Sequence, residues 1–367
     1  MYEILFGPCR VGSLEIRNRF VRSATWDATA DESGAVTDTS VAFYKRLGEG
    51  GIGLIVSGHA FVSALGQATP RQYGAHNDDM IPGLRRLVQA VHEGGGKIAL
   101  QIAHAGINSG HLMSSGVTLP AVSRIPEMKR LHQEMTGEEI DGIVDDFAAA
   151  AVRGREAGFD AIQLHGAHGY LMSQFISPLY NHRTDRWGGS AENRRRFYTE
   201  VVHRVRQAIG PDFPFFIKFG VMDDSEGGLT LEDGIEAARQ MVAAGIDAIE
   251  VSGGVGQGVY RTGENGTVRT PFQERAAAVK RAVEAPVILV AGIRSLETAQ
   301  DIVMSGGADM VSMCRPFIRE PHLVVRWQRG ETAPATCITC NKCMAIVQRA
   351  EPLDCGEERR LREEIGA

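Results

Sequence analysis

The sequence predicts a single (β/α)₈ barrel, an α/β fold, followed by a cysteine-rich C-terminal extension. Eight short runs are apolar with few polar interruptions, which is typical of parallel strands buried on both faces. Longer amphipathic stretches alternate with these runs. No GxGxxG fingerprint opens a helix after an early strand, which disfavours an open dinucleotide-binding sheet. We therefore expect residues 1–330 to form the barrel and residues 331–367 to form an extension packed on it.

The predicted strands and helices follow one another along the chain. Strands are expected over residues 19–25, 53–58, 97–103, 160–165, 214–220, 247–253, 286–292 and 309–314. Helices are expected over residues 79–93, 137–157, 191–209, 230–244, 273–283 and 295–305. Thr136, with Glu139 three residues later, forms a capping-box pattern that starts one of the helices. Motifs of the type Ala-Gly-x-Asp place a glycine between a helix end and the next strand.

The connection between the third and fourth strands is unusually long. It runs from about residue 106 to residue 133 and is rich in Gly, Ser and Pro. Long loops in compact domains are often lids or binding loops. We expect residues 108–130 of this loop to shape the choice of substrate, although their side chains do not specify one.

Composition and charge narrow the function classes. The net charge is −6, the sequence pI is about 6.0, and charged residues make up 23% of the 367 residues. A chain without a basic surplus is not expected to bind nucleic acid or anionic membranes. The N-terminus lacks the pattern of a signal peptide, and no run approaches the ~18 apolar residues of a membrane span. We expect a cytoplasmic protein, and the sequence leaves open whether it forms a homo-oligomer.

The end of the fourth strand carries the strongest set of chemical groups. His165 and His168 lie three residues apart, and Tyr170 follows two residues later. Barrel enzymes place their chemistry on the loops after the strands, so these groups could bind a substrate oxygen and deliver a proton. Two satisfied histidines with a packed tyrosine are the structural alternative. A metal site is disfavoured because the sequence offers no obvious third ligand.

The ends of the seventh and eighth predicted strands, together with Lys218, suggest an anion site. The seventh strand ends in Gly292-Ile293-Arg294 and the eighth in Cys314-Arg315, where barrels commonly bind phosphate. Lys218 lies within an apolar strand, and buried cations are rare without a partner. Lys218 is therefore either one half of an internal ion pair or a fixed positive charge beneath an anionic cofactor.

A long stretch after the fourth strand resembles a known family. The run from His165 to Pro178, followed by residues 181–194, resembles the signature of the old yellow enzyme family of NADH:flavin oxidoreductases. Matching segments also occur at residues 5–6, 18–19, 101–106 and 315–317. The resemblance implies an FMN cofactor in the barrel and NAD(P)H as reductant. It implies a ping-pong reaction that reduces a carbon–carbon double bond beside an electron-withdrawing group, as in an enone.

The resemblance also implies residue roles. His165 and His168 would hold the substrate carbonyl oxygen, so that the β-carbon accepts hydride from flavin N5. Tyr170 would give a proton to the α-carbon. The residues expected to contact FMN are Ser23, Ala24, Thr25 and Gly58 along the ring, Gln101 and Lys218 at its pyrimidine edge, and Gly292, Arg294, Cys314 and Arg315 at the phosphate.

The sequence departs from the family pattern at three places. Thr25 and Trp26 stand where relatives often carry Thr or Cys near the flavin, and either could face the ring. Ile107 occupies a position where relatives often have Arg. Cys314 replaces the usual Gly before Arg-Pro, which affects the expected phosphate turn.

Four cysteines near the C-terminus have ligand-like spacing. Cys337, Cys340, Cys343 and Cys355 follow the pattern C-x₂-C-x₂-C-x₁₁-C, which suits either a [4Fe–4S] cluster or tetrahedral zinc. The segment resembles the iron–sulfur segment of 2,4-dienoyl-CoA reductase and trimethylamine dehydrogenase, where the second gap is usually one residue longer. Those relatives carry extra dinucleotide-binding domains, for which this chain is too short. We expect a cluster here to exchange electrons with a partner protein or to be structural; four reduced thiols in a mobile tail are the alternative.

Two other enzyme classes remain as alternatives. Within the family, the chain could be a dienoyl-thioester reductase or an amine dehydrogenase, although an amine needs an aromatic cage more than an oxygen-binding histidine pair. Outside the family, a phosphosugar or aldol-type barrel would have to use Lys218 as its Schiff-base lysine.

Overall fold

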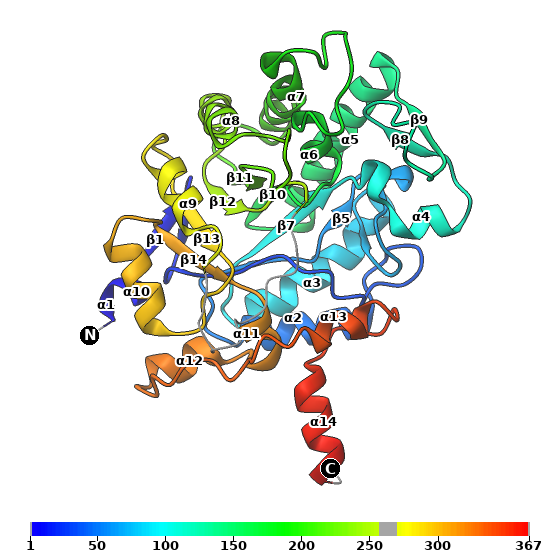
Figure 1. The fold of residues 1–367 in the computed structure, drawn as a ribbon. Helices are drawn as coiled ribbons and strands as arrows, with labels where there is room; N and C mark the ends of the chain where they lie inside the picture. The colour runs from blue at the N-terminus through cyan, green and yellow to red at the C-terminus, as the bar shows by residue number, and fades with distance from the viewer. Residues whose placement is uncertain (1, 257–269, 366–367) are drawn as a thin grey trace.

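The computed structural model describes residues 2–256 and 270–365 (Figure 1). Eight parallel strands close into a barrel, because β10 pairs with β11 on one side and with β7 on the other. In chain order the barrel strands are β3 (Phe20–Arg22), β4 (Leu54–Val56), β7 (Ile98–Ala103), β10 (Ala161–Gly166), β11 (Phe215–Gly220), β12 (Ile249–Ser252), β13 (Val287–Val290) and β14 (Met310–Met313). Each lies within or overlaps a predicted strand, so the predicted (β/α)₈ barrel is confirmed.

Helices surround the barrel and fill the connections (Figure 1). The longer ones are α2 (Asp38–Gly48), α3 (Ile81–Glu93), α5 (Gly137–Ala157), α7 (Ala191–Ile209), α8 (Leu231–Ala243), α9 (Gln273–Lys280) and α10 (Leu296–Met304). The predicted capping box is present, since Thr136 Oγ1 accepts from the Glu139 backbone and Glu139 accepts from the Thr136 backbone. Gly158 ends α5 with a φ of 94°, a left-handed conformation that glycine adopts without steric cost.

Residue alternation along the strands divides the barrel interior into layers. Successive side chains of a strand point to opposite faces, so residues two apart share the interior. Apolar residues at the lower positions belong to one buried cluster inside the barrel: Val21, Ala99, Ala161, Phe216, Ala248 and Met310. Two residues further along each strand lie the polar residues Ser23, Gln101, Gln163, Lys218, Glu250 and Ser312. The barrel therefore has an apolar lower layer and a polar layer just below its C-terminal mouth.

An antiparallel hairpin packs against the apolar layer. It consists of β1 (Cys9–Val11) and β2 (Leu14–Ile16), and its Val11 and Ile16 are buried in the same cluster. The hairpin was not predicted, because three-residue strands carry too little periodicity. Helix α2 was also not predicted, although Thr37 forms a capping box with Ser40 at its start.

Short strands, helices and 3₁₀ turns lie in the loops around the mouth of the barrel. They are β5 (Ala60–Phe61), β6 (Tyr73–Gly74), β8 (Leu119–Ala121), β9 (His132–Glu134), α4 (Gly110–Ser114), α6 (Leu171–Ile176), and the 3₁₀ turns η1 (Ala64–Gly66), η2 (Asp78–Met80) and η3 (Gly106–Asn108). Helix α1 (Glu3–Phe6) lies at the other end of the barrel, where the Leu5 carbonyl accepts from the Arg19 N–H just before β3. Strands β8 and β9 give the predicted long loop a small two-stranded sheet. Arg183 anchors this sheet by donating to the carbonyls of Val122 and Met135 while it pairs with Asp185.

The chain after the last barrel strand runs along the side of the barrel. It contains α11 (Arg315–Arg319), α12 (Leu323–Gln328), α13 (Lys342–Val347) and α14 (Gly356–Ile365), the last of which projects from the body (Figure 1). The Ala335 N–H donates to the Arg294 carbonyl, and the Leu353 N–H donates to the Asp27 carbonyl. The predicted domain boundary at residue 330 stays a prediction. No helix among the described residues is long and apolar enough to cross a membrane.

Candidate active site

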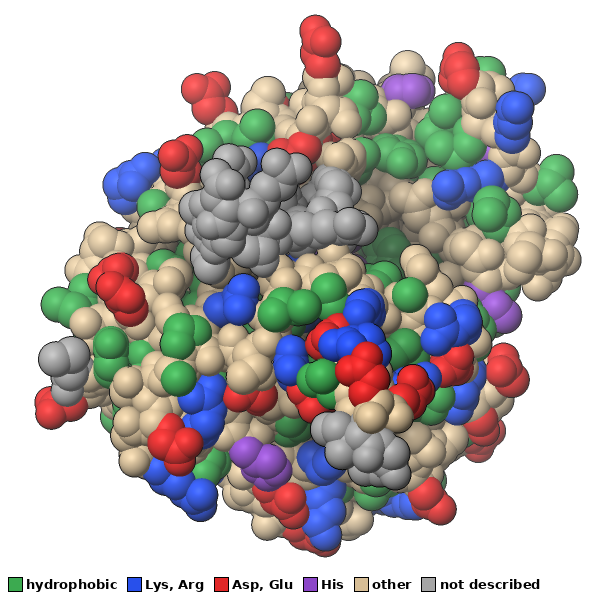
Figure 2. Space-filling view, turned by 60° about the horizontal axis from the view of Figure 1, so that its bottom comes forward, with side chains coloured by type: hydrophobic (Ala, Val, Ile, Leu, Met, Phe, Trp, Pro, Cys, Tyr) green, Lys and Arg blue, Asp and Glu red, His purple; other side chains and the backbone are tan. Residues whose placement is uncertain are grey.

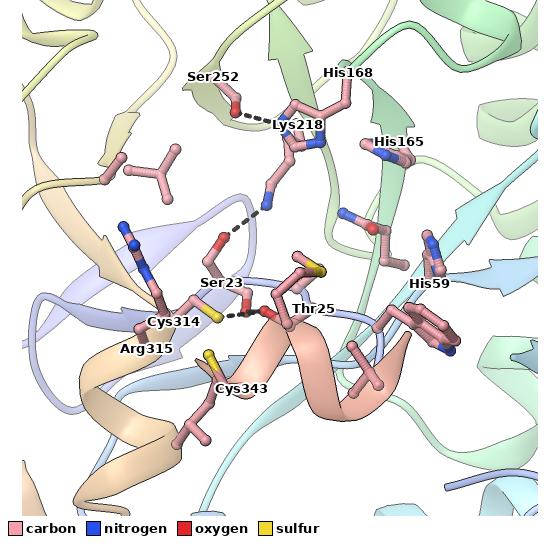
Figure 3. A pocket seen from close by; sticks show the side chains of 18 of the residues that line it. Ser23, Thr25, His59, His165, His168, Lys218, Ser252, Cys314, Arg315 and Cys343 are labelled. Carbon is pink, nitrogen blue, oxygen red and sulfur yellow. Dashed lines mark hydrogen bonds between the residues drawn. The ribbon is translucent and has the colours of Figure 1, made fainter. Parts of the chain in front are cut away.

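A cavity of 360 Å³ opens at the C-terminal ends of the barrel strands (Figure 3). Its volume falls within the range of about 300–1,000 Å³ that is typical of small-molecule sites. Side chains from β7, β10, β11, β12 and β13 and from the segments after β3, β4, β10, β13 and β14 line it. Helix α13 of the C-terminal extension supplies a further wall through Cys343, Met344 and Val347. The cavity therefore lies where the two parts of the chain meet.

The floor of the cavity is a buried polar network. Lys218 Nζ donates to Ser23 Oγ (2.6 Å) and lies 3.5 Å from Glu250 Oε2. Ser23, Ser312 and Gln163 all donate to the Glu250 carboxylate, each at 2.8 Å. Both alternatives for Lys218 are thus compatible with the structure, since the lysine belongs to an internal ion pair and also lines the cavity. Glu250 was missed in the sequence, although it interrupts an apolar strand.

His165, His168 and Tyr170 are brought together at one side of the cavity. The His165 ring centroid lies 5.1 Å from that of His168 and 4.8 Å from that of Tyr170, both with edge-to-face geometry. His168 Nε2 lies 2.7 Å from Ser252 Oγ (Figure 3). His168 has a φ of 60° and Gly169 a φ of 75°, so the turn holds a non-glycine residue in the left-handed region. Such strained residues persist where the surrounding structure holds them, often at functional sites.

Burial keeps these groups uncharged near neutral pH. Burial, with smaller contributions from His168, His59 and Lys218, lowers the pKa of His165 well below its usual 6.5. Burial and the Lys218 charge lower the pKa of His168 to about 3. Burial raises the pKa of Tyr170 to about 12. The site therefore presents neutral imidazoles and a protonated phenol, which can donate hydrogen bonds to an oxygen without adding charge.

The loops after β13 and β14 lie at the opposite side of the cavity from the histidines. Ala291 and Gly292 both have positive φ, 79° and 81°, and Ala291 lines the cavity. Arg315 also lines it, and its Nη1 donates to Asn341 Oδ1 at 2.6 Å. Arg294 instead donates to the Ala335 carbonyl, and neither it nor Gly292 is among the lining residues.

Both Thr25 and Trp26, the two candidates in the segment after β3, face the cavity. Ser23, Ala24, Thr25 and Trp26 all line it. The Thr25 hydroxyl contacts the Cys314 thiol (Figure 3), whereas the Trp26 indole donates to the Pro70 carbonyl. Gly58 lies behind the wall, where a Cβ would come within 3.0 Å of Asp27 and 3.2 Å of Tyr73.

The four cysteines of the extension surround a second, smaller cavity. Cys337, Cys340, Cys343 and Cys355 all line it together with Arg315 and Arg319. Cys343 lines both cavities, so the cysteine segment adjoins the candidate active site. Burial raises the pKa of Cys337, and burial with smaller contributions from Cys314 and Cys337 raises that of Cys343 to about 12. Among the described residues, no three His, Cys, Asp or Glu side chains converge as ligands of a single ion.

Several lining residues were not predicted. His59 follows β4 and contacts Tyr170, Ser252 is the last residue of β12, and Asn341 comes from the extension. His59 and Ser252 could have been found by the rule used for His165, because each lies at the C-terminal end of a barrel strand. Asn341 had no such signal, since only the docking of the extension brings it to the cavity.

Comparison with known proteins places the chain among flavin enzymes. Residues 4–333 match the model of the NADH:flavin oxidoreductase / NADH oxidase family. An NADH oxidase of Thermoanaerobacter brockii is 36% identical over 92% of this chain, and an NADPH dehydrogenase of a Geobacillus species is 35% identical over 88%. This chain spans 52% of the length of the NADH oxidase but 93% of the NADPH dehydrogenase.

Two solved structures share the fold over nearly the whole chain. A 2-naphthoyl-CoA reductase complex has a TM-score of 0.90 at 28% identity and covers 97% of this chain, which spans 57% of that protein. An old yellow enzyme homologue from Zymomonas mobilis has a TM-score of 0.79 at 26% identity. It covers 96% of this chain, which spans 97% of that protein.

Proposed function

Because this chain belongs to the NADH:flavin oxidoreductase / NADH oxidase family, we propose that it is an FMN-dependent enzyme that uses NAD(P)H to reduce activated carbon–carbon double bonds. The resemblance to the old yellow enzymes is confirmed by the family match and by the fold of the Zymomonas homologue. The observation that carries the proposed reaction is the packing of two neutral imidazoles and a protonated phenol beside the cavity. The substrate class is an α,β-unsaturated carbonyl compound such as an enone.

The residues of the cavity fit FMN. A buried cation, Lys218, lies at the floor, where the electron-rich pyrimidine edge of the isoalloxazine would lie, and Gln101, which also lines the cavity, offers an amide. Arg315 and the left-handed turn at Ala291 and Gly292 lie where the phosphate would bind. Ser23, Ala24 and Thr25 would line the ring. When bound, FMN would take a hydride from NAD(P)H and transfer it to the alkene in a second half-reaction.

The chain's own residues prepare the alkene for reduction. His165 and His168 would donate hydrogen bonds to the substrate carbonyl oxygen and stabilise the negative charge that develops there. The neutral state of both imidazoles leaves each with one N–H group for this purpose. His165 Nδ1 is buried and has no hydrogen-bond partner among the described residues. Tyr170 would give its proton to the α-carbon, because its raised pKa keeps the phenol protonated.

The lining favours a carbonyl substrate over an ammonium substrate. Among the described residues that line the cavity, none is an aspartate or glutamate, whereas Lys218 and Arg315 bring positive charge. An amine dehydrogenase would have to place its cation beside these groups. The phosphosugar or aldol alternative is also disfavoured, because the Lys218 ammonium is held by Ser23 and Glu250 rather than free to form a Schiff base.

The decisive experiment follows the two half-reactions in purified protein. The flavin spectrum should bleach with NADH and recover when cyclohexenone is added. In Tyr170→Phe, recovery should slow by roughly 10²–10⁴-fold, because the proton donor is lost. Tyr180→Phe, a tyrosine outside the cavity lining, is the matched control. A colourless protein would refute the cofactor, and recovery at the wild-type rate in Tyr170→Phe would refute the role of Tyr170.

The cysteine segment supports a second part of the proposal, an iron–sulfur cluster. All four thiols line one cavity, yet no three ligands among the described residues converge on a single ion. Four thiols around one cavity fit either a [4Fe–4S] cluster or zinc, and the resemblance of the segment to iron–sulfur segments of larger family members puts the cluster ahead. Metal binding must displace the thiol protons, most of all at Cys343, whose pKa is raised to about 12.

Analysis of iron and labile sulfide in anaerobically purified protein tests the cluster. We expect both to be present in the wild type and lost in Cys337→Ser, since each thiolate is needed as a ligand. Cys9→Ser, a cysteine outside the segment, should retain them. Stoichiometric zinc without sulfide would reverse the assignment.

A further inference from the structure

His59 is a cavity residue that neither the family signature nor the proposed reaction uses. It lies between β4 and β5, and its side chain reaches the cavity wall opposite Arg315 (Figure 3). The residue is only 7% exposed, although histidine is a polar side chain. A buried imidazole at a barrel mouth calls for a structural or chemical reason.

The imidazole of His59 packs directly on the proposed proton donor. Its Nε2 lies 3.2 Å from the Tyr170 hydroxyl oxygen, and the two rings stack with centroids 5.6 Å apart and planes at 24°. His59 and His165 also lie close, with ring centroids 6.2 Å apart. Among the described residues, His59 Nδ1 is buried without a hydrogen-bond partner. The contact with Tyr170 is thus the hydrogen bond that the described structure offers this imidazole.

The need for such a contact follows from the chemistry of a buried phenol. When a phenol gives its proton to carbon, it becomes a phenolate, and an anion in a desolvated site is costly without donors. Burial alone already raises the pKa of Tyr170 to about 12. A neighbouring N–H group would stabilise the phenolate and would also leave the phenol proton free to point into the cavity. His59 is suited to this task as a neutral imidazole, since burial lowers its pKa to about 4.

We propose that His59 is a positioning residue for Tyr170: its Nε2–H donates to the phenol oxygen, orients the O–H toward the substrate and stabilises the phenolate left after proton transfer. The inference rests on the proposed function in that Tyr170 is the acid. In the step concerned, the Tyr170 O–H bond breaks and a C–H bond forms at the α-carbon. The phenolate regains a proton from water when product leaves, and His59 stays neutral throughout. His165, Lys218 and Tyr170 are the titratable groups that face it.

Two substitutions separate the hydrogen bond from the packing. His59→Phe keeps a ring that can stack on Tyr170 but has no donor, whereas His59→Gln keeps an N–H donor without the ring. In a single turnover of NADH-reduced holoenzyme with cyclohexenone, His59→Phe should slow the enone step on the order of 10-fold to 100-fold. His59→Gln should recover part of this loss. The NADH half-reaction, which needs no proton from Tyr170, reports folding and cofactor loading.

The double variant tests whether His59 acts through Tyr170. If it does, His59→Phe combined with Tyr170→Phe should be no slower in the enone step than Tyr170→Phe alone. A further slowing of equal size in the Tyr170→Phe background would show that His59 acts independently and would overturn the inference. A Tyr170→Phe variant at full speed would refute the proposed function itself, so the two failures are distinguishable.

A spectroscopic measurement gives a readout that does not depend on turnover. With 3,5-difluorotyrosine at position 170, whose phenol ionises at lower pH, ¹⁹F NMR reports the ionisation midpoint. Replacing His59 with Phe should raise that midpoint by about one pH unit or more, because the phenolate loses a donor. His59→Gln should raise it less. An unchanged midpoint in His59→Phe would show that the ring only fills space and would overturn the inference.

Discussion

The mouth of the barrel and the C-terminal extension (residues 331–365) are stabilised in different ways. In the mouth, charged and polar side chains come from buried strands and satisfy one another, as Lys218 and Glu250 do with Ser23. In the extension, ion pairs lie on the outside, with Arg and Glu interspersed along α14 (Figure 2). The buried network cannot lose one member without leaving a desolvated charge, whereas water replaces a lost surface partner.

The largest expected effect is on the free energy of unfolding, when one lysine from each region is replaced by methionine. Lys218→Met should destabilise the protein by about 3–5 kcal/mol, because it leaves the Glu250 carboxylate buried without its cation. Lys342→Met removes the surface pair with Glu357 and should change stability by less than about 1 kcal/mol. Urea unfolding followed by circular dichroism measures both. Adding Glu250→Gln to Lys218→Met should restore part of the lost stability. Equal losses in the two lysine variants would contradict the difference between the buried network and the surface ion pairs.

The contributions of the two regions to stability should also respond to acid over different pH ranges. The folded-state pKa values of His59, His104 and His168 are lowered to about 4, 3 and 3, mainly by burial. Below about pH 6.5 these histidines become protonated in the unfolded chain but stay neutral in the folded chain. The free energy of unfolding should therefore fall as the pH drops from 7 toward 5. By pH 5 each histidine contributes a loss of about 2 kcal/mol.

The surface carboxylates of the extension respond at lower pH. Hydrogen bonds from arginine and lysine lower the pKa of Glu351 and Glu357 to about 2, so their contribution is present above about pH 4.5 and is lost only as pH falls toward 2. Urea midpoints measured at pH 7.5, 6 and 5 test the difference. A flat profile between pH 7.5 and 5 would contradict the burial of neutral histidines, and a smaller slope in His104→Asn would support it.

The smallest expected effect concerns the hydrogen bond that joins the two regions. Asn341 of the extension accepts from Arg315 at the proposed phosphate end of the cavity. Asn341→Gly removes this acceptor but tolerates the φ of 62° found there. Affinity for FMN, measured by fluorescence titration of the apoprotein, should fall roughly fivefold, as for the loss of one hydrogen bond. Lys342→Met is the control, and an unchanged affinity in Asn341→Gly would show that the extension does not act on the cofactor site.

Much of the fold follows from local patterns. The eight barrel strands were predicted because each is an apolar run followed by turn residues, and α5 because its capping box is encoded within four residues. The β1–β2 hairpin and α2 were missed, since their stability comes from packing against the barrel rather than from their own periodicity. Strong local signals were therefore read correctly, and elements that depend on partners were not.

In the candidate site as well, local patterns were predicted and contacts between distant residues were not. His165, His168 and Tyr170 were predicted to lie together because they share one turn, and Lys218 was recognised as a cation in an apolar strand. Glu250 was not linked to Lys218, because the two residues are paired only by the register between β11 and β12. His59 was missed because its contact with Tyr170 joins loops after two strands that do not neighbour each other in the barrel.

By itself, the sequence determined the barrel, the family and the identity of the groups at the strand ends. These features depend on hydrophobic periodicity and motif spacing, which are encoded within short stretches of the chain. Only the tertiary structure decided which of these groups touch. The register between β11 and β12 placed Glu250 beside Lys218, barrel closure placed His59 beside Tyr170, and the docking of the extension brought Asn341 and Cys343 to the cavity. Burial in that assembled site then determined which side chains are charged, since the cost of desolvation depends on neighbours that are distant in the sequence.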